Sequence, residues 1–176
     1  MLTGDRLKEI GLFESLGDEG RAEFAAASEE VRFSPGEAII EEGTEPDSMY
    51  VLLSGRAEVY RRVRGGVEER LAAIDADDGG AVVGERGLLR PSPASATVRA
   101  VDAVEAVRIP RQVFRRMIEA GHPAAYELAY RISRTLARRL VQLDEEAARA
   151  IRRLEDRPQD AELEVFRDRL ITEWSV

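Results

Sequence analysis

A glycine and a glutamate, Gly84 and Glu85, precede a short helix-forming run from Arg86 to Leu89. Prolines at positions 91 and 93 end that run. A glycine turn that leads into a helix leaves backbone N–H groups unpaired, and such a terminus carries roughly half a positive charge. This arrangement suits a phosphate, and Glu85 is an acceptor placed for a sugar hydroxyl. The alternative is a tight turn with a carboxylate at the start of a helix.

The order of residues in this stretch resembles the phosphate-binding cassette of cyclic-nucleotide-binding domains. The family's pattern runs Phe-Gly-Glu-Leu-Ala-Leu, a few turn residues, and then Pro-Arg-Ala-Ala-Thr-Val-Arg-Ala. The matching positions are Gly84, Glu85, Gly87, Leu88, Leu89, Pro93, Ala96, Thr97, Val98, Arg99 and Ala100. The resemblance implies a nucleotide site formed by Val83, Gly84, Glu85, Arg86, Gly87, Leu88, Ala94, Ser95 and Ala96. In it, backbone N–H groups from Gly84 to Leu88 hold the phosphate and Glu85 holds the ribose 2′-hydroxyl.

One position departs from the family's pattern, because the arginine that grips the cyclic phosphate is replaced by Ala94. A guanidinium offers parallel donors to a phosphate, whereas a methyl group offers none. Loss of a charge-assisted pair costs on the order of 1.5–3 kcal/mol, which is about tenfold to a hundredfold in affinity. Arg86 and Arg90 are close enough in sequence to substitute, and the alternative for both is a solvated arginine on a short exposed helix.

Composition limits the classes of function. The chain has 176 residues, a formal net charge of -8 and no cysteine, so it has neither disulfides nor thiol chemistry. The acidic balance argues against a nucleic-acid surface, since phosphate contacts need clustered positive charge. No apolar run is long enough for a membrane span, and no signal-peptide pattern opens the chain. We expect a cytoplasmic protein with no membrane partner.

Two further features bear on metal or catalytic chemistry. The acidic segment 75–78 lacks the spacing of a calcium loop, so it is interpreted as a solvated loop. The single histidine, His122, has no partner set for zinc or catalysis and is interpreted as a structural loop residue. No nucleophile, triad or metal set is evident, so we expect neither an enzyme nor a required cofactor.

The elements that must position the cassette are mainly β-strands. Residues 2–13 predict a short amphipathic helix, and a second helix follows from about Asp18 to residue 27. From Val31 to Ile109 the apolar period changes to two, with turns at short intervals, among them a hairpin turn at Gly65-Gly66. About eight short strands favour an antiparallel sandwich or jelly roll, as the family resemblance also implies. We therefore predict one unit over residues 1–122.

A long helix is predicted next, over a segment 123–157. Six of its residues repeat at intervals of four and three, namely Leu136, Leu140, Leu143, Ala147, Ala150 and Leu154. Such a heptad seam favours a parallel two-helix homodimer. The alternative is a helix that lies along its own barrel.

The remaining segment, residues 158–176, begins at Pro158 and predicts an amphipathic tail helix. Its apolar residues are Leu163, Phe166, Leu170, Ile171 and Trp174. One helix of net acidic character cannot read DNA, so no nucleic-acid partner is expected. The apolar face either folds back on the protein or docks a protein partner.

The leading hypothesis is a stand-alone regulatory module that senses cyclic AMP or cyclic GMP and dimerises through the long helix. The first alternative is a ligand-free scaffold of the same fold, in which Ala94 marks a degenerate pocket and residues 158–176 bind a protein. The second alternative is a protein similar to a transcription regulator.

Overall fold

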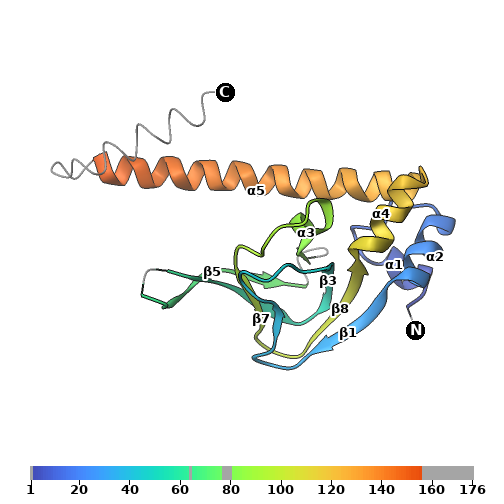
Figure 1. The fold of residues 1–176 in the computed structure, drawn as a ribbon, viewed down its shortest axis with the longest axis horizontal. Helices are drawn as coiled ribbons and strands as arrows, with labels where there is room; N and C mark the ends of the chain where they lie inside the picture. Colours follow the sequence, from blue (N-terminus) through green and yellow to red (C-terminus); the bar gives the residue numbers. More distant parts are fainter. Residues whose placement is uncertain (1, 64, 77–80, 156–176) are drawn as a thin grey trace. The chain divides into compact units, whose positions relative to one another are not determined.

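In the computed structural model, the described residues form eight strands in two four-stranded antiparallel sheets, and Figure 1 shows how they are arranged. The structure describes residues 2–63, 65–76 and 81–155. One sheet has the order β1-β8-β3-β6 and the other the order β2-β7-β4-β5. The strands are β1 (Glu29–Phe33), β2 (Ala38–Ile40), β3 (Ser48–Ser54), β4 (Arg56–Arg62), β5 (Glu68–Asp75), β6 (Val82–Val83), β7 (Thr97–Ala100) and β8 (Val104–Pro110). The predicted jelly roll with flanking helices is confirmed.

Five helices accompany the sheets within the described residues. They are α1 (Gly4–Lys8), α2 (Asp18–Ala27), α3 (Glu85–Leu89), α4 (Arg111–Glu119) and α5 (Pro123–Glu155). The helix predicted over residues 2–13 is shorter than expected, since α1 ends at Lys8 and residues 9–16 form turns. Those turns still bury Leu12 and Phe13, and the Phe13 ring lies 5.9 Å from the ring of Phe24 in α2.

An apolar core fills the space between the two sheets. It contains Ile39, Ile40, Leu52, Ala57, Val83, Val98, Ala100, Val104 and Ala106. Because side chains alternate along a strand, the residues on one face of each sheet meet in this core. Val83 belongs to it, so the residue directly before Gly84 is fixed in the roll.

The chain divides into two compact units, residues 1–132 and 133–176, and the boundary falls inside α5. The sequence predicts different boundaries, with one part ending at residue 122 and the next at residue 157, and this division stays a prediction. The tail from residue 158 and the acids at 77 and 78 lie outside the described residues. Leu154 lies within α5, but the structure does not describe its side chain.

His122 caps the long helix. Its Nδ1 accepts a hydrogen bond from the backbone N–H of Ala124 at 3.2 Å, and its Nε2 lies 2.7 Å from a carboxylate oxygen of Glu23 in α2. Pro123 occupies the first helical position, where no N–H is needed. The interpretation of His122 as a loop residue is therefore refined, because this loop residue fixes the start of α5.

We expect the substitution His122→Ala to lower the free energy of unfolding by about 1 kcal/mol, the usual effect of losing an N-cap. Denaturant unfolding followed by circular dichroism measures it. Arg115→Ala is a suitable control, because it removes an exposed ion pair within α4 and should cost less than about 0.5 kcal/mol. Equal stabilities of His122→Ala and the unsubstituted protein would contradict the capping role.

Candidate nucleotide-binding cassette

Gly84 makes the turn between β6 and α3. Its φ of 78° lies in the left-handed region, which favours glycine. A Cβ at this position would come within 3.0 Å of the Ser48 carbonyl oxygen and of Ile40 Cδ1. Strand β6 pairs with β3 through Val83 and Tyr50, which holds the turn against the sheet. The turn thus requires glycine for its conformation and for the space around it.

The helix α3 carries the first half of the predicted site. Glu85, Gly87 and Leu88 are buried, and Glu85 is only 5% exposed. The backbone N–H of Leu88 donates to the carbonyl of Gly84 at 3.3 Å. Burial of a carboxylate is costly unless polar groups compensate it, so a buried Glu85 is unusual for a surface turn.

The loop after α3 carries the second half, centred on Ala94. Its backbone N–H donates to the Thr44 carbonyl at 2.7 Å, and its carbonyl accepts from the N–H of Gly43 at 2.9 Å. Ala94 is half-buried and packs against the roll core. Ser95 is exposed and Ala96 is half-buried. The cassette loop is therefore paired to the segment 43–44, far away in sequence.

One side chain joins the two halves. Nη2 of Arg86 in α3 donates to the carbonyl oxygen of Pro93 at 2.7 Å. Pro93 directly precedes Ala94, so the Arg86 guanidinium lies beside the position where the sequence pattern lacks its arginine. Arg90 is exposed and forms the C-cap of α3 in an extended conformation.

The segment 43–48 supports both halves, and the sequence analysis did not assign it a role. Besides its bonds to Ala94, it faces Gly84 through Ser48, and Pro46 is 3.4 Å from where a Cβ of Gly87 would lie. Arg111 at the start of α4 holds the segment by bonding Glu45 at 3.1 Å and the carbonyl of Pro46. A glycine at 43 and a proline at 46 are the sequence signals of this turn.

A second arginine binds the same segment from β8. Arg108 contacts Asp47 at 3.1 Å and also bonds Glu29 in β1. The hydrogen bond from Ser48 and the bond from Arg108 lower the pKa of Asp47 from its ordinary value. Asp47 thus keeps its charge, and with it the ion pair to Arg108, at neutral pH.

Comparison with known proteins identifies the family. The model of the cyclic nucleotide-binding domain matches residues 30–120, which include the whole cassette. The chain belongs to the cyclic nucleotide-binding domain family. This membership confirms the resemblance inferred from the cassette residues.

Two curated relatives of this cyclic nucleotide-binding domain are regulators. A cAMP-dependent protein kinase regulatory subunit from Emericella nidulans is 37% identical over 112 residues, which is 64% of this chain and 26% of the relative. A CRP-like cAMP-activated global transcriptional regulator from Mycobacterium tuberculosis is 28% identical over 134 residues, or 76% of this chain and 57% of the relative. The chain thus spans about a quarter of the kinase regulatory subunit and somewhat more than half of the transcriptional regulator. It is homologous to regulatory proteins of both kinds.

A solved structure shows the same fold. The Catabolite Activator Protein of Thermus thermophilus superposes with a TM-score of 0.67 and 26% sequence identity, covering 78% of this chain and 62% of that one. This similarity confirms the jelly-roll architecture of the domain.

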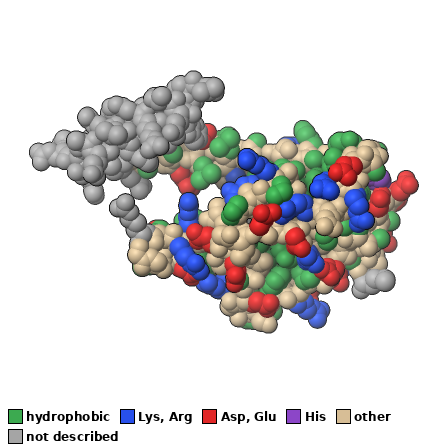
Figure 2. Space-filling view, viewed as in Figure 1, with side chains coloured by type: hydrophobic (Ala, Val, Ile, Leu, Met, Phe, Trp, Pro, Cys, Tyr) green, Lys and Arg blue, Asp and Glu red, His purple; other side chains and the backbone are tan. Residues whose placement is uncertain are grey.

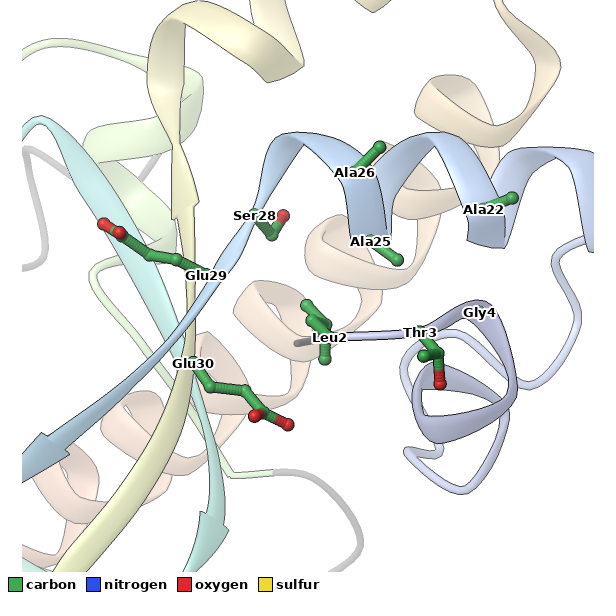
Figure 3. Close-up of a pocket in the computed structure, with 9 residues that line it drawn as sticks. All are labelled: Leu2, Thr3, Gly4, Ala22, Ala25, Ala26, Ser28, Glu29 and Glu30. Carbon is green, nitrogen blue, oxygen red and sulfur yellow. The ribbon is translucent and has the colours of Figure 1, made fainter.

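Two other surface features of the domain differ from the cassette. A hollow of about 610 Å³ lies between α1, the end of α2 and the start of β1 (Figure 3). It is lined by Leu2, Thr3, Gly4, Ala22, Ala25, Ala26, Ser28, Glu29 and Glu30, and it contains none of the predicted ligand residues.

On the face shown in Figure 2, arginine and acidic side chains are interspersed, and no large basic patch forms there.

The described part of the chain has neither a membrane-spanning helix nor a cluster of metal-binding side chains. No helix in it is both long and apolar enough to cross a bilayer. No group of three or more His, Cys, Asp or Glu side chains is arranged there to hold a metal ion.

The predicted seam residues lie on α5. Leu140 and Leu143 are 54% and 60% exposed. Leu136 and Ala147 are half-buried, and Ala150 is exposed. Large apolar side chains at this exposure are candidates for a contact with another helix.

Proposed function

We propose that this chain is a non-enzymatic regulatory module that binds a cyclic nucleotide at the cassette 83–96. The observation that carries the proposal is the Gly84 turn, because a left-handed glycine and a buried Glu85 open α3 at the positions where the family's sequence pattern has its glycine and glutamate. Backbone N–H groups from Gly84 to Gly87 hold the phosphate, since the N–H of Leu88 is already bonded to the Gly84 carbonyl. Glu85 accepts a hydrogen bond from the ribose 2′-hydroxyl. Leu52, Val83 and Leu88 supply apolar contacts around the nucleotide.

Cyclic AMP is the first ligand to test. Both curated relatives carry cAMP in their names, and cyclic GMP differs only in its base. The cassette contacts described above involve phosphate and ribose, so they favour neither base. Specificity between the two nucleotides therefore depends on residues outside these contacts.

Isothermal titration of the full chain with cyclic AMP and cyclic GMP tests the proposal. Linear 5′-AMP is the control ligand, since it has the same base and sugar without the cyclic phosphate. We expect saturable binding of one cyclic nucleotide per chain and weaker binding of 5′-AMP. Absence of heat with every nucleotide at millimolar concentration would favour the ligand-free scaffold, which the packing of Ala94 against the roll core also supports.

The second part of the proposal is a homodimer formed through α5. The exposed Leu140 and Leu143 support it, because they follow the four-three spacing of a two-helix seam. Alanines at two seam positions permit a close approach of the helices. A protein partner for the segment 158–176 stays a separate hypothesis.

A further inference from the structure

We propose that Arg86 supplies the positive charge that faces the cyclic phosphate, in place of the family's arginine missing at position 94. This inference rests on the proposed function, because it names a binding residue of the same site. It assigns the cassette an anionic ligand despite Ala94.

The position of the Arg86 side chain is the first support. Arg86 extends from α3 across the cassette, and its Nη2 bonds the Pro93 carbonyl at 2.7 Å. Since Pro93 is bonded to Ala94, the guanidinium lies at the border of the place that the family's arginine would fill. A guanidinium has five N–H donors, and this bond uses one of them. Donors therefore remain for phosphate oxygens.

Three arginines on the elements around the cassette are the second support, because each of them is bonded to a carboxylate. Arg111 bonds Glu45, Arg108 bonds Glu29 and Asp47, and Arg99 bonds Glu68. The hydrogen bond of Arg86, in contrast, goes to a neutral carbonyl. An arginine with a neutral partner keeps more of its charge available to an incoming anion than one paired with a carboxylate.

The surroundings of Ala94 are consistent with Arg86 taking the place of the family's arginine. Ala94 packs against the roll core, and its backbone is bonded on both sides to the segment 43–44. An arginine there would approach the phosphate from the loop, whereas Arg86 approaches from α3. The cassette thus still contains one cationic side chain, which comes from α3 and not from the loop.

The test is a calorimetric titration of the full chain with cyclic AMP, using Arg86→Ala and the matched control Arg90→Ala. Both variants remove an exposed arginine of the same short segment, so the net charge changes equally. We expect Arg86→Ala to weaken cyclic AMP binding about tenfold to a hundredfold, as for loss of a charge-assisted pair. Arg90→Ala should leave the affinity nearly unchanged.

A second ligand distinguishes two roles of Arg86, a direct contact with the phosphate and a structural bond to the loop. Adenosine lacks the phosphate, so Arg86→Ala should leave adenosine binding unchanged if the guanidinium contacts phosphate. If Arg86 only ties the loop to α3, the substitution weakens both ligands alike, and the inference is wrong. In the double variant Arg86→Ala with Ala94→Arg, we expect cyclic AMP binding to recover.

Failure of the role of Arg86 and failure of the proposed function give different results. Equal cyclic AMP affinities of the unsubstituted chain and Arg86→Ala overturn the role of Arg86 alone. If the unsubstituted chain binds no cyclic nucleotide, the proposed function and this inference both fail. Thermal unfolding of each variant shows whether the fold is retained.

Discussion

Replacement of Gly84 by alanine is expected to lower cyclic AMP affinity by at least about a hundredfold, as when two charge-assisted hydrogen bonds to a phosphate are lost. A left-handed conformation costs a residue with a Cβ about 1–2 kcal/mol. The added methyl group would also lie 3.0 Å from the Ser48 carbonyl oxygen and from Ile40 Cδ1. Because the carbonyl belongs to the backbone, the turn itself must move, and the N–H groups of α3 move with it. Titration calorimetry measures the loss.

Gly36 provides the matched control for this substitution. Its φ is 85°, close to the value at Gly84, but a Cβ there meets no atom within 4 Å. Gly36→Ala therefore places a residue with a Cβ in the left-handed conformation without displacing neighbours. We expect it to lower the stability of the fold and to leave the affinity for cyclic AMP unchanged. If both alanine variants bind cyclic AMP as well as the unsubstituted chain, the Gly84 turn does not hold the phosphate.

The double substitution Leu140→Glu and Leu143→Glu is expected to convert a dimer into a monomer. Two leucines from each helix lose their burial, at about 1.5–3 kcal/mol for each side chain. The dissociation constant of the dimer should therefore rise by more than about a thousandfold. Sedimentation velocity measures the change, since the mass should fall from twice 19.6 kDa to 19.6 kDa.

Val141→Glu is the control for this pair. Val141 is 56% exposed and lies next to the seam in sequence, but its position turns it away from the four-three repeat. It adds a carboxylate to the same turn of the helix, and we expect the dimer to persist. A monomeric unsubstituted chain would contradict the dimer proposal, as would equal dissociation by Val141→Glu.

Short-range signals made much of the fold predictable. The period of two and the closely spaced turns predicted about eight strands, and the part of the chain that the structure describes forms eight. The glycine before a helix-forming run predicted the turn at Gly84, because φ above zero there excludes most other residues. The helix over residues 2–13 was predicted too long because buried apolar residues in turns, such as Phe13, follow a helical spacing without forming a helix.

Contacts between distant residues were not predictable in the same way. The bonds between Ala94 and the segment 43–44 join residues about fifty positions apart, and no local pattern encodes them. The bond of Arg86 to Pro93 depends on a side-chain direction, which residue types alone do not give. The capping bond of His122 likewise depends on the backbone geometry between two helices.

Hydrogen exchange of the full chain, with and without saturating cyclic AMP, tests the central claim most directly because it locates the ligand. We predict slower exchange in peptides that cover residues 83–96 and in the supporting segment 43–48. Protection that appears only around the hollow formed by residues 2–30, or no protection anywhere, would contradict a nucleotide site at the cassette.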